Sequence, residues 1–532
     1  MPEFLNAFIY VAMIFAVSCI FNYRPMQTVV GDRRAKLWMV VWLMITAAMF
    51  LTRNVWLFLA VSSLMLFIAA RSDRSPVALY VLAIPIVYAP TLVVPGFAGI
   101  ESLFHVTPID FYAATLLVPL MFSRDFTASG TALKSGPFFW LCMYLGLSVV
   151  LATRDANATT ILRMAVGLFL SALLPFMVVV KTVNTKEKIE NVLAAFVFAL
   201  VPMGAIGAFE SLKHWRLYTS ATSAWGESLL GSSYLERAGS LRATGPLAGP
   251  IVFGFVFMIA LGLFLGLASR IPSWWQRLIV IGALGLGIIS SLSRGPWVGA
   301  VAIVLIFILT GRNALSNLTK LVVLAVIFLG MASMTQFGSR IIDTLPFVGI
   351  SETENVDYRA DLFDNALIVI LRHPLFGSDD YLETPEMQDM IQGQGIIDIV
   401  NSYVQIALKA GLVGLAIYLL FFFTVLLGLW SAIRQVPDTE VDLKTLGRAL
   451  LATLCGALLT IATVSNIGQI PYLLWLLTGL STAYCAIVRG DGRQLGLSVS
   501  DLTLSRFERS GNRSEKSMTP KETLSSPKAR LK

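Results

Sequence analysis

Arginine side chains stand at intervals beside long apolar runs, and their chemistry is the most distinctive in the chain. Arg242 precedes one such run and Arg294 lies between two of them, while Arg359 and Arg372 lie near the two ends of an amphipathic segment. A guanidinium group is planar and holds two phosphate oxygens at once. Two or three such groups, fixed in place, would stabilise a departing diphosphate. The four arginines therefore indicate a site for an anionic substrate, with diphosphate as the natural candidate.

Arg294 is the most constrained of the four. The link around it, 290–297, is too short to lift a guanidinium group far from a membrane. A charge at that depth is costly, so it requires a partner or a function. Gly295 and Pro296 permit a tight break between the neighbouring helices. The alternative is an interfacial arginine that snorkels beside Trp297, and Arg242 has the same ordinary alternative.

The segment around Arg359 and Arg372 has the pattern of an amphipathic helix. Apolar residues recur at helical spacing before a His-Pro pair ends the run. The positions are Tyr358, Leu362, Ala366, Leu367 and Ile370, followed by His373 and Pro374. Local roles for the arginines are also open: Arg359 could pair with Asp361 or Asp364, and Arg372 could complement the helix C-terminus.

The elements that must position these arginines are predicted to be membrane-spanning helices. Of 532 residues, 56% are hydrophobic and only 14% are charged, whereas soluble domains carry about 25% charged residues. The composition excludes a soluble enzyme. We expect an all-α, polytopic bundle of about 14–15 transmembrane helices. The apolar runs lie near 4–21, 37–52, 55–70, 77–95, 109–122, 137–152, 161–180, 190–209, 248–268, 277–293, 296–310, 319–336, 401–431, 447–466 and 470–488.

Positive charge orients the predicted bundle. Lys and Arg gather in short loops of one parity and in the last segment, which places that side and the C-terminus in the cytoplasm. The candidate arginines then fall on the outer side. We expect six regions: N-terminal transmembrane helices (1–209), an outer loop (210–247), helices around Arg294 (248–336), a large periplasmic loop with the amphipathic helix (337–400), C-terminal helices (401–488) and a disordered basic tail (489–532).

No residue pattern predicts a metal site or a bound cofactor. The four cysteines lie in or at the edge of apolar runs, without metal-ligand or redox spacing; they are Cys19, Cys142, Cys455 and Cys485. The net charge of +8 is explained by the basic loops, so no nucleic-acid partner is expected.

Four short motifs lie between about 230 and 430. The first is 242–250, followed by Phe253 and Gly254, and the second is 291–297 with its Ser-Arg-Gly sequence. The third joins Tyr358 and Arg359 to 372–377, and the fourth joins 401–405 to 411–414. In this order they resemble the motifs of the O-antigen ligase and polymerase family of bacterial envelope glycosyltransferases. The first 200 residues match that family only as generic spans.

The resemblance implies a helical, metal-independent glycosyltransferase of the C-type architecture. Such enzymes use glycans linked to undecaprenyl diphosphate at the outer face of the inner membrane. The resemblance carries the diphosphate-binding role over to Arg242, Arg294 and Arg359. We also expect Arg372 to bind diphosphate, and Asn401 and Tyr403 to position the acceptor. The implied partners are the lipid-linked glycan and the bilayer, together with a chain-length regulator and a flippase.

One position departs from the family pattern. Ligases of this family place a catalytic histidine directly before the Asn that corresponds to Asn401, and here that position is Val400. The departure favours a polymerase, whose members lack this histidine. Asp398 would then serve as general base or orient the acceptor hydroxyl. Alternatively, it caps the next helix.

Three functions are open at this point. The leading one is a polymerase that transfers a growing O-antigen or exopolysaccharide glycan from undecaprenyl diphosphate onto another lipid-linked repeat unit. The second is a ligase that moves finished glycan to lipid A core or to protein, with Asp398 in place of the histidine. The third is a transporter or flippase, which the near absence of ionisable residues in the middle of the spans disfavours.

Overall fold

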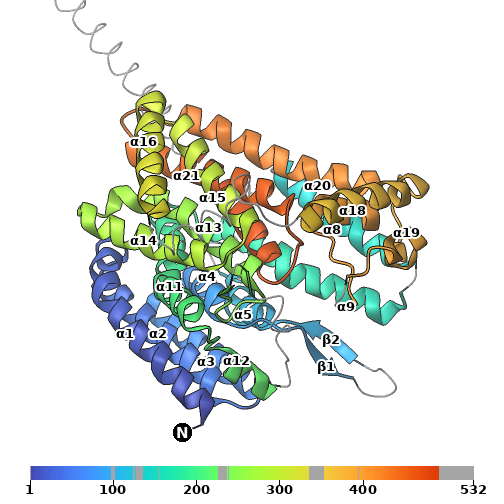
Figure 1. Ribbon diagram of the computed structural model, residues 1–532, viewed down its shortest axis with the longest axis horizontal. Coiled ribbons are helices and arrows are strands. Elements are labelled where there is room, and N and C mark those ends of the chain that lie inside the picture. Colours follow the sequence, from blue (N-terminus) through green and yellow to red (C-terminus); the bar gives the residue numbers. More distant parts are fainter. Residues whose placement is uncertain are drawn as a thin grey trace, which may run out of the picture.

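The computed structural model is a bundle of apolar helices (Figure 1). It describes residues 2–96, 102–123, 126, 136–154, 156–225, 236–237, 239–334, 353–392 and 395–490. Several predicted regions therefore lie partly outside the described residues. The largest gaps are 491–532 of the basic tail, 337–352 of the large loop and 226–235 of the outer loop.

The first three helices form an up-and-down series, shown in blue in Figure 1. They are α1 (Glu3–Val30), α2 (Asp32–Leu51) and α3 (Val55–Asp73). Each apolar run folds as a helix because lipid offers no partner for backbone N–H and C=O groups. Asn54 begins α3 as its N-cap, since its side chain accepts hydrogen bonds from the N–H groups of Trp56 and Leu57.

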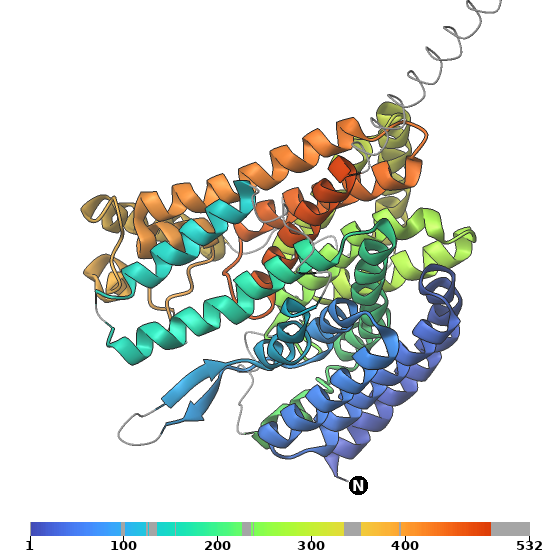
Figure 2. The same ribbon diagram turned by 180° about the vertical axis from the view of Figure 1, so that it is seen from behind.

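The predicted span at 77–95 is wrong in its second half. Helix α4 (Pro76–Ala83) continues only as a 3-10 turn, η1 (Ile84–Ile86). Pro85 and Pro90 lack the N–H that a longer helix needs. The chain instead forms an antiparallel hairpin of β1 (Leu92–Pro95) and β2 (Ser102–Val106), which projects from the bundle in Figure 1 and, from behind, in Figure 2. Residues 77–87 are buried by other parts of the protein, so this short helix does not have to span the lipid by itself.

The next helices lead to the centre of the bundle. α5 (Pro108–Leu116), α6 (Val118–Met121) and α8 (Gly136–Leu151) precede a nearly continuous run. That run consists of α9 (Ala158–Leu168), the π-turn η3 (Phe169–Leu173) and α10 (Leu174–Thr182). α11 (Lys186–Lys213) then crosses the middle of the bundle and packs against α1 and α4.

Four helices follow the first outer loop. The loop contains α12 (Thr219–Thr222), η4 (Ser223–Trp225) and a small hairpin of β3 (Glu236–Arg237) and β4 (Ser240–Leu241). The helices are α13 (Pro250–Leu267) with its terminal turn η6 (Ala268–Arg270), α14 (Trp274–Ser290), α15 (Arg294–Leu309) and α16 (Ala314–Ser333). α11 approaches α14 closely at Gly204, where a Cβ would lie 2.1 Å from the backbone oxygen of Ala283. Small residues permit such contacts between membrane helices.

The predicted amphipathic helix is α18 (Thr353–Arg372), which packs on the first part of α20 (Ser402–Gln435). Its inner face is confirmed for Tyr358, Leu362, Ala366 and Ile370. The prediction is wrong for Leu367, which is 42% exposed, whereas Val369 is buried on this face. At 3.6 residues per turn, position 369 returns to the face of 362 and 366, and position 367 turns away from it.

The chain after α18 forms backbone hydrogen bonds with α20 at a bend in that helix. Gly411 interrupts that helix with a φ of 67°, and the N–H of Leu412 donates to the carbonyl of Pro374 at 2.8 Å. The N–H of Ser378 donates to the carbonyl of Leu408 at 3.0 Å. Two of the motifs, 372–377 and 411–414, therefore form one joint, next to η7 (Tyr381–Glu383) and α19 (Pro385–Gln388).

The last two helices are α21 (Val441–Ile461) and the helix Ile470–Gly490. Within the described ranges, nine helices are long and apolar enough to cross a membrane, and six further apolar helices are shorter, with 10–17 residues. The prediction of an all-α, polytopic helix bundle is confirmed. The number of crossings, about 14–15, stays a prediction.

Candidate functional site

Glu210 organises the loop that carries Arg242. This carboxylate lies in the last turn of α11 and is fully buried. Its Oε2 accepts hydrogen bonds from the N–H groups of Thr244 at 3.1 Å and Gly245 at 3.0 Å, and its Oε1 accepts one from Leu217 at 3.0 Å. A buried carboxylate without such donors would be strongly destabilising. Glu210 therefore fixes the shape of the first motif.

Arg242 reaches from this loop to the turn before α15. Its side chain is buried, with 7% exposed. Nε donates to the carbonyl of Ser291 at 3.3 Å and Nη2 donates to Oγ of Ser293 at 2.9 Å. The N–H of Ala243 adds a bond to the carbonyl of Ser290 at 2.9 Å. The first and second motifs are thus in direct contact, and Arg242 supports the turn that presents Arg294.

Arg294 is the first residue of α15, and its side chain is half-buried. The N-terminus of a helix carries partial positive charge and unpaired N–H groups, which favour a bound anion. The next residue, Gly295, lies against a loop from a distant part of the chain. A Cβ there would lie 2.9 Å from Oγ1 of Thr463 and 3.0 Å from Cγ1 of Val464.

That distant segment, 462–469, joins α21 to the last helix, and we name it the crossing loop. The hydroxyl of Ser402, at the start of α20, donates to the carbonyl of Val464 at 2.9 Å. The hydroxyl of Ser465 donates to Oδ1 of Asp398 at 2.5 Å. A Cβ at Gly468 would lie 2.9 Å from Cβ of Ala248, just before α13. The crossing loop therefore brings the starts of α13, α15 and α20 together.

Arg359 completes the group from the large loop. The hydroxyl of its neighbour Tyr358 donates to the backbone carbonyl of Asp398 at 3.2 Å. Partial removal from water lowers the pKa of Arg359, the Asp398 carboxylate raises it, and the charges of Arg237 and Arg294 lower it. Arg294, Arg359 and Asp398, which were predicted separately, thus share one electrostatic neighbourhood.

Three predicted site residues have other contacts. Arg372 lies thirteen residues after Arg359 on α18, which is about 20 Å along a helix, and its Nη1 donates to Oε2 of Glu386 at 3.0 Å. The structure therefore separates it from the arginine group. Asn401 is the N-cap of α20 and accepts from the N–H groups of Tyr403 and Val404, at 3.0 and 3.3 Å. The Tyr403 hydroxyl donates to the carbonyl of Leu458 at 2.8 Å, so acceptor positioning by these two residues stays a prediction.

The sequence analysis did not predict that Glu210, Ser465 and Arg237 belong to this region. Glu210 had one usable signal, an acidic residue in the last turn of a long apolar run. Ser465 had none, because serines are common at helix ends. The arrangement as a whole combines several guanidinium groups and a helix N-terminus with one carboxylate. Such a set can hold a multiply charged oxyanion and accept a proton from a nearby hydroxyl.

Comparison with known proteins agrees with the motifs in this region. Residues 278–419 match the family model described as O-Antigen ligase. The matched stretch runs from α14 into α20 and contains Arg294, Arg359 and Asp398, whereas Arg237 and Arg242 precede it. No curated protein matches the chain significantly.

Proposed function

We propose that this chain, which carries a domain of the O-antigen ligase family at residues 278–419, is a polysaccharide polymerase. It transfers O-antigen or exopolysaccharide glycan from undecaprenyl diphosphate onto a second lipid-linked repeat unit. The reaction takes place at the periplasmic face of the bacterial inner membrane. The helix bundle supports this assignment, because a lipid-linked substrate reaches the protein from the bilayer itself.

One arrangement carries the proposal: the crossing loop holds the Asp398 carboxylate through Ser465 and packs against Gly295, the residue after Arg294. The backbone of Asp398 in turn accepts a hydrogen bond from Tyr358, the residue before Arg359. The two arginines come from distant elements, so the fold and not the local sequence assembles the group. A diphosphate has several charged oxygens, which can accept hydrogen bonds from more than one guanidinium group at once.

In the proposed reaction the arginines stabilise the leaving group, and Asp398 accepts the proton of the attacking hydroxyl. The acceptor hydroxyl attacks the anomeric carbon of the donor sugar, and the bond between that carbon and the diphosphate oxygen breaks. The diphosphate leaves with the electron pair, and Arg294 and Arg359 stabilise its added charge. Arg242 holds the turn that presents Arg294. Asp398 takes the proton from the hydroxyl, with its carboxylate held by Ser465.

A ligase is the second candidate, since the matching family model bears that description. Val400 occupies the place of the ligase histidine, which favours the polymerase. A deletion strain separates the two functions. Loss of the polymerase leaves single lipid-linked repeat units, whereas loss of a ligase leaves long polymer that is never attached. The chain-length regulator and the flippase enter only as expected partners of the polymerase.

The assignment of the arginines is tested by complementing the deletion strain with the double variant Arg242→Ala, Arg294→Ala. We expect short surface polysaccharide on gels, because the turn and its arginine are both lost. The matched control is Lys213→Ala, which removes one positive charge from the exposed end of α11 without touching the group. Normal chain length in the double variant would overturn the assignment.

A further inference from the structure

The small hairpin of β3 and β4 is held by hydrogen bonds to the end of α11 and to the residue after it. It consists of the pairs Glu236 with Leu241 and Arg237 with Ser240. The Ser211 hydroxyl, in the last turn of α11, donates to the carbonyl of Leu241 at 2.7 Å. A ring nitrogen of His214 lies 3.2 Å from the carbonyl oxygen of Gly239 in the hairpin turn. The hairpin is therefore held at both its base and its turn, and its orientation is defined.

This orientation places Arg237 on the turn that precedes α15. Its Nη1 donates to the carbonyl of Leu292 at 3.0 Å. Leu292 has a φ of 45°, in the left-handed region that apolar side chains rarely adopt. Arg242 bonds to the carbonyl of Ser291 in the same turn. Arg237, in β3, and Arg242, directly after β4, thus donate hydrogen bonds to the carbonyl groups of two adjacent residues.

The two arginines differ in burial. Arg242 is 7% exposed, whereas Arg237 is only half-buried. Arg237 also acts on Arg359 in the same sense as Arg294 does, lowering the pKa of that guanidinium group. The contacts agree, because Arg237 bonds to the backbone two residues before Arg294, and the crossing loop lies against Gly295 while it holds Asp398, to which Tyr358 bonds. Three arginines from three separate elements, a hairpin, a helix N-terminus and the large-loop helix, therefore converge on one region.

We propose that Arg237 is a further diphosphate-binding residue of this site. Together with Arg294 and Arg359 it offers the anion three guanidinium groups from three separate elements. A diphosphate carries more charge and more acceptor oxygens than a monophosphate, so a third guanidinium group favours diphosphate over monophosphate. This inference rests on the proposed function, because it assigns a new residue to the same ligand.

The test measures binding of a named probe, farnesyl diphosphate, to the full chain purified in detergent, with farnesyl monophosphate in parallel. We expect Arg237→Ala to weaken diphosphate binding by roughly ten- to a hundredfold, the range for a lost charge-assisted hydrogen bond. The preference over monophosphate falls at the same time. Arg237→Lys recovers part of the affinity, since it restores the charge without the fork. Lys213→Ala, which removes an exposed charge at the end of α11, leaves both affinities unchanged.

The outcomes separate this inference from the proposed function. If the wild-type chain binds the diphosphate probe and both Arg237 variants bind it equally well, Arg237 is no ligand, although the proposed function stands. If the wild-type chain does not bind the probe, the proposed function fails and the inference fails with it. Should Arg237→Ala not fold, because the Leu292 turn loses its support, Arg237→Lys decides. It must then show the weaker binding and the reduced preference for diphosphate.

Discussion

The Asp398 carboxylate lies at the meeting point of the large loop and the crossing loop. Its Oδ1 accepts the hydrogen bond from Ser465, and its charge acts on Arg359. The other oxygen of the carboxylate can face an incoming hydroxyl while Ser465 holds the first. The N-cap of α20 is Asn401, so the alternative that Asp398 caps this helix does not apply.

We predict that Asp398→Asn slows glycan transfer by about a hundredfold or more, the usual contribution of a general base. Asn keeps the shape of the side chain and can still bond to Ser465, but it cannot take a proton. Affinity for the lipid diphosphate should change little. Single-turnover rates with a lipid-linked repeat unit measure the effect, and Asp389→Asn, at an exposed loop position, is the control. Equal rates for the two variants would show that Asp398 is not the general base.

Single residues were predictable from the sequence only where their surroundings made them anomalous. Arg294 stands out because it interrupts two apolar runs, and Arg359 because it belongs to a recognisable motif. Arg237 resembles any other loop arginine. Its role follows from the hairpin that holds it against Leu292, and that contact depends on tertiary structure.

At the scale of elements, the joint between α18 and α20 sets the position of the large loop. Gly411 and Gly377 both have positive φ values, 67° and 69°. A Cβ at Gly411 would lie 2.3 Å from the carbonyl oxygen of Leu375, and a Cβ at Gly377 would lie 2.3 Å from that of Leu408. Neither position can accept a side chain unless the backbone moves.

We predict that Gly411→Ala loosens this joint and thereby misplaces Arg359. The strain of a left-handed alanine, about 1–2 kcal/mol, adds to the clash with Leu375. Hydrogen exchange at the amides of Ser378 and Leu412, which bridge the joint, should become faster. The control on the same helix is Gly428→Ala, whose Cβ would meet only Sγ of Cys485, at 3.8 Å. Unchanged exchange in Gly411→Ala would show that the joint does not depend on this glycine.

Most helices could be predicted because a long run of apolar residues is a strong signal for a membrane helix. Helix α18 could be predicted because its apolar residues recur at helical spacing. The hairpin of β1 and β2 could not. Its residues, such as Leu92 to Val94, read as the end of an apolar span. What stops the helix is the pair of prolines at 85 and 90, together with a protein environment that spares α4 from spanning lipid alone. Tertiary burial of this kind leaves no periodic trace in the sequence.

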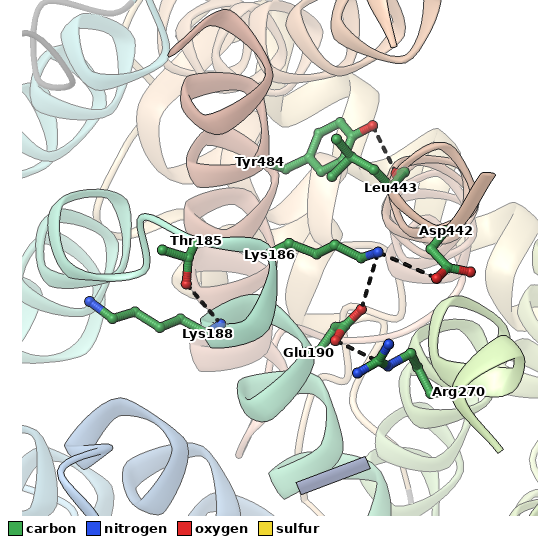
Figure 3. A network of polar contacts seen from close by, with 8 residues as sticks. All are labelled: Thr185, Lys186, Lys188, Glu190, Arg270, Asp442, Leu443 and Tyr484. Atoms are coloured by element: carbon green, nitrogen blue, oxygen red, sulfur yellow. Dashed lines mark hydrogen bonds and ion pairs between the residues drawn. The ribbon is translucent and has the colours of Figure 1, made fainter. Parts of the chain in front are cut away.

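On the scale of the whole molecule, polar contacts gather at two opposite ends of the bundle. Glu210 belongs to the arginine end, and Glu190, twenty residues earlier on α11, lies about 30 Å away. Glu190 Oε1 is 3.9 Å from Nζ of Lys186, and its Oε2 is 3.4 Å from Nε of Arg270. Lys186 also pairs with Asp442 at 3.4 Å. Figure 3 shows how this network joins α11, the end of α13 and α21.

The contacts at this second end agree with the charge pattern of the sequence. Lys186, Arg270 and Asp442 lie at helix ends, beside three of the short loops in which Lys and Arg predict one common side, and the structure places them together. Arg34 and Asp73, from two further loops of that side, are also paired, at 2.5 Å. Which side faces the cytoplasm stays a prediction.

We predict that Glu190→Gln lowers the free energy of unfolding by about 1–3 kcal/mol, because two cations lose their partly buried counter-charge. Solvent screening of Lys186 and Arg270, which are 31% and 41% exposed, keeps the loss in this range. Thermal unfolding in detergent measures it. Asp32→Asn, in an exposed pair with Lys36, should leave the midpoint nearly unchanged. Diphosphate binding should survive in both variants, and its loss in Glu190→Gln would mean that the two ends are coupled.

Reconstituted glycan transfer tests the central claim most directly. The purified chain is placed in lipid vesicles with repeat units linked to undecaprenyl diphosphate, and product length and released lipid diphosphate are followed on gels. We predict a ladder of lengthened glycan for the wild-type chain and for Lys213→Ala, and loss of the ladder for Arg294→Ala. A wild-type chain that never lengthens the glycan, or an Arg294→Ala variant that lengthens it at the wild-type rate, would contradict the account.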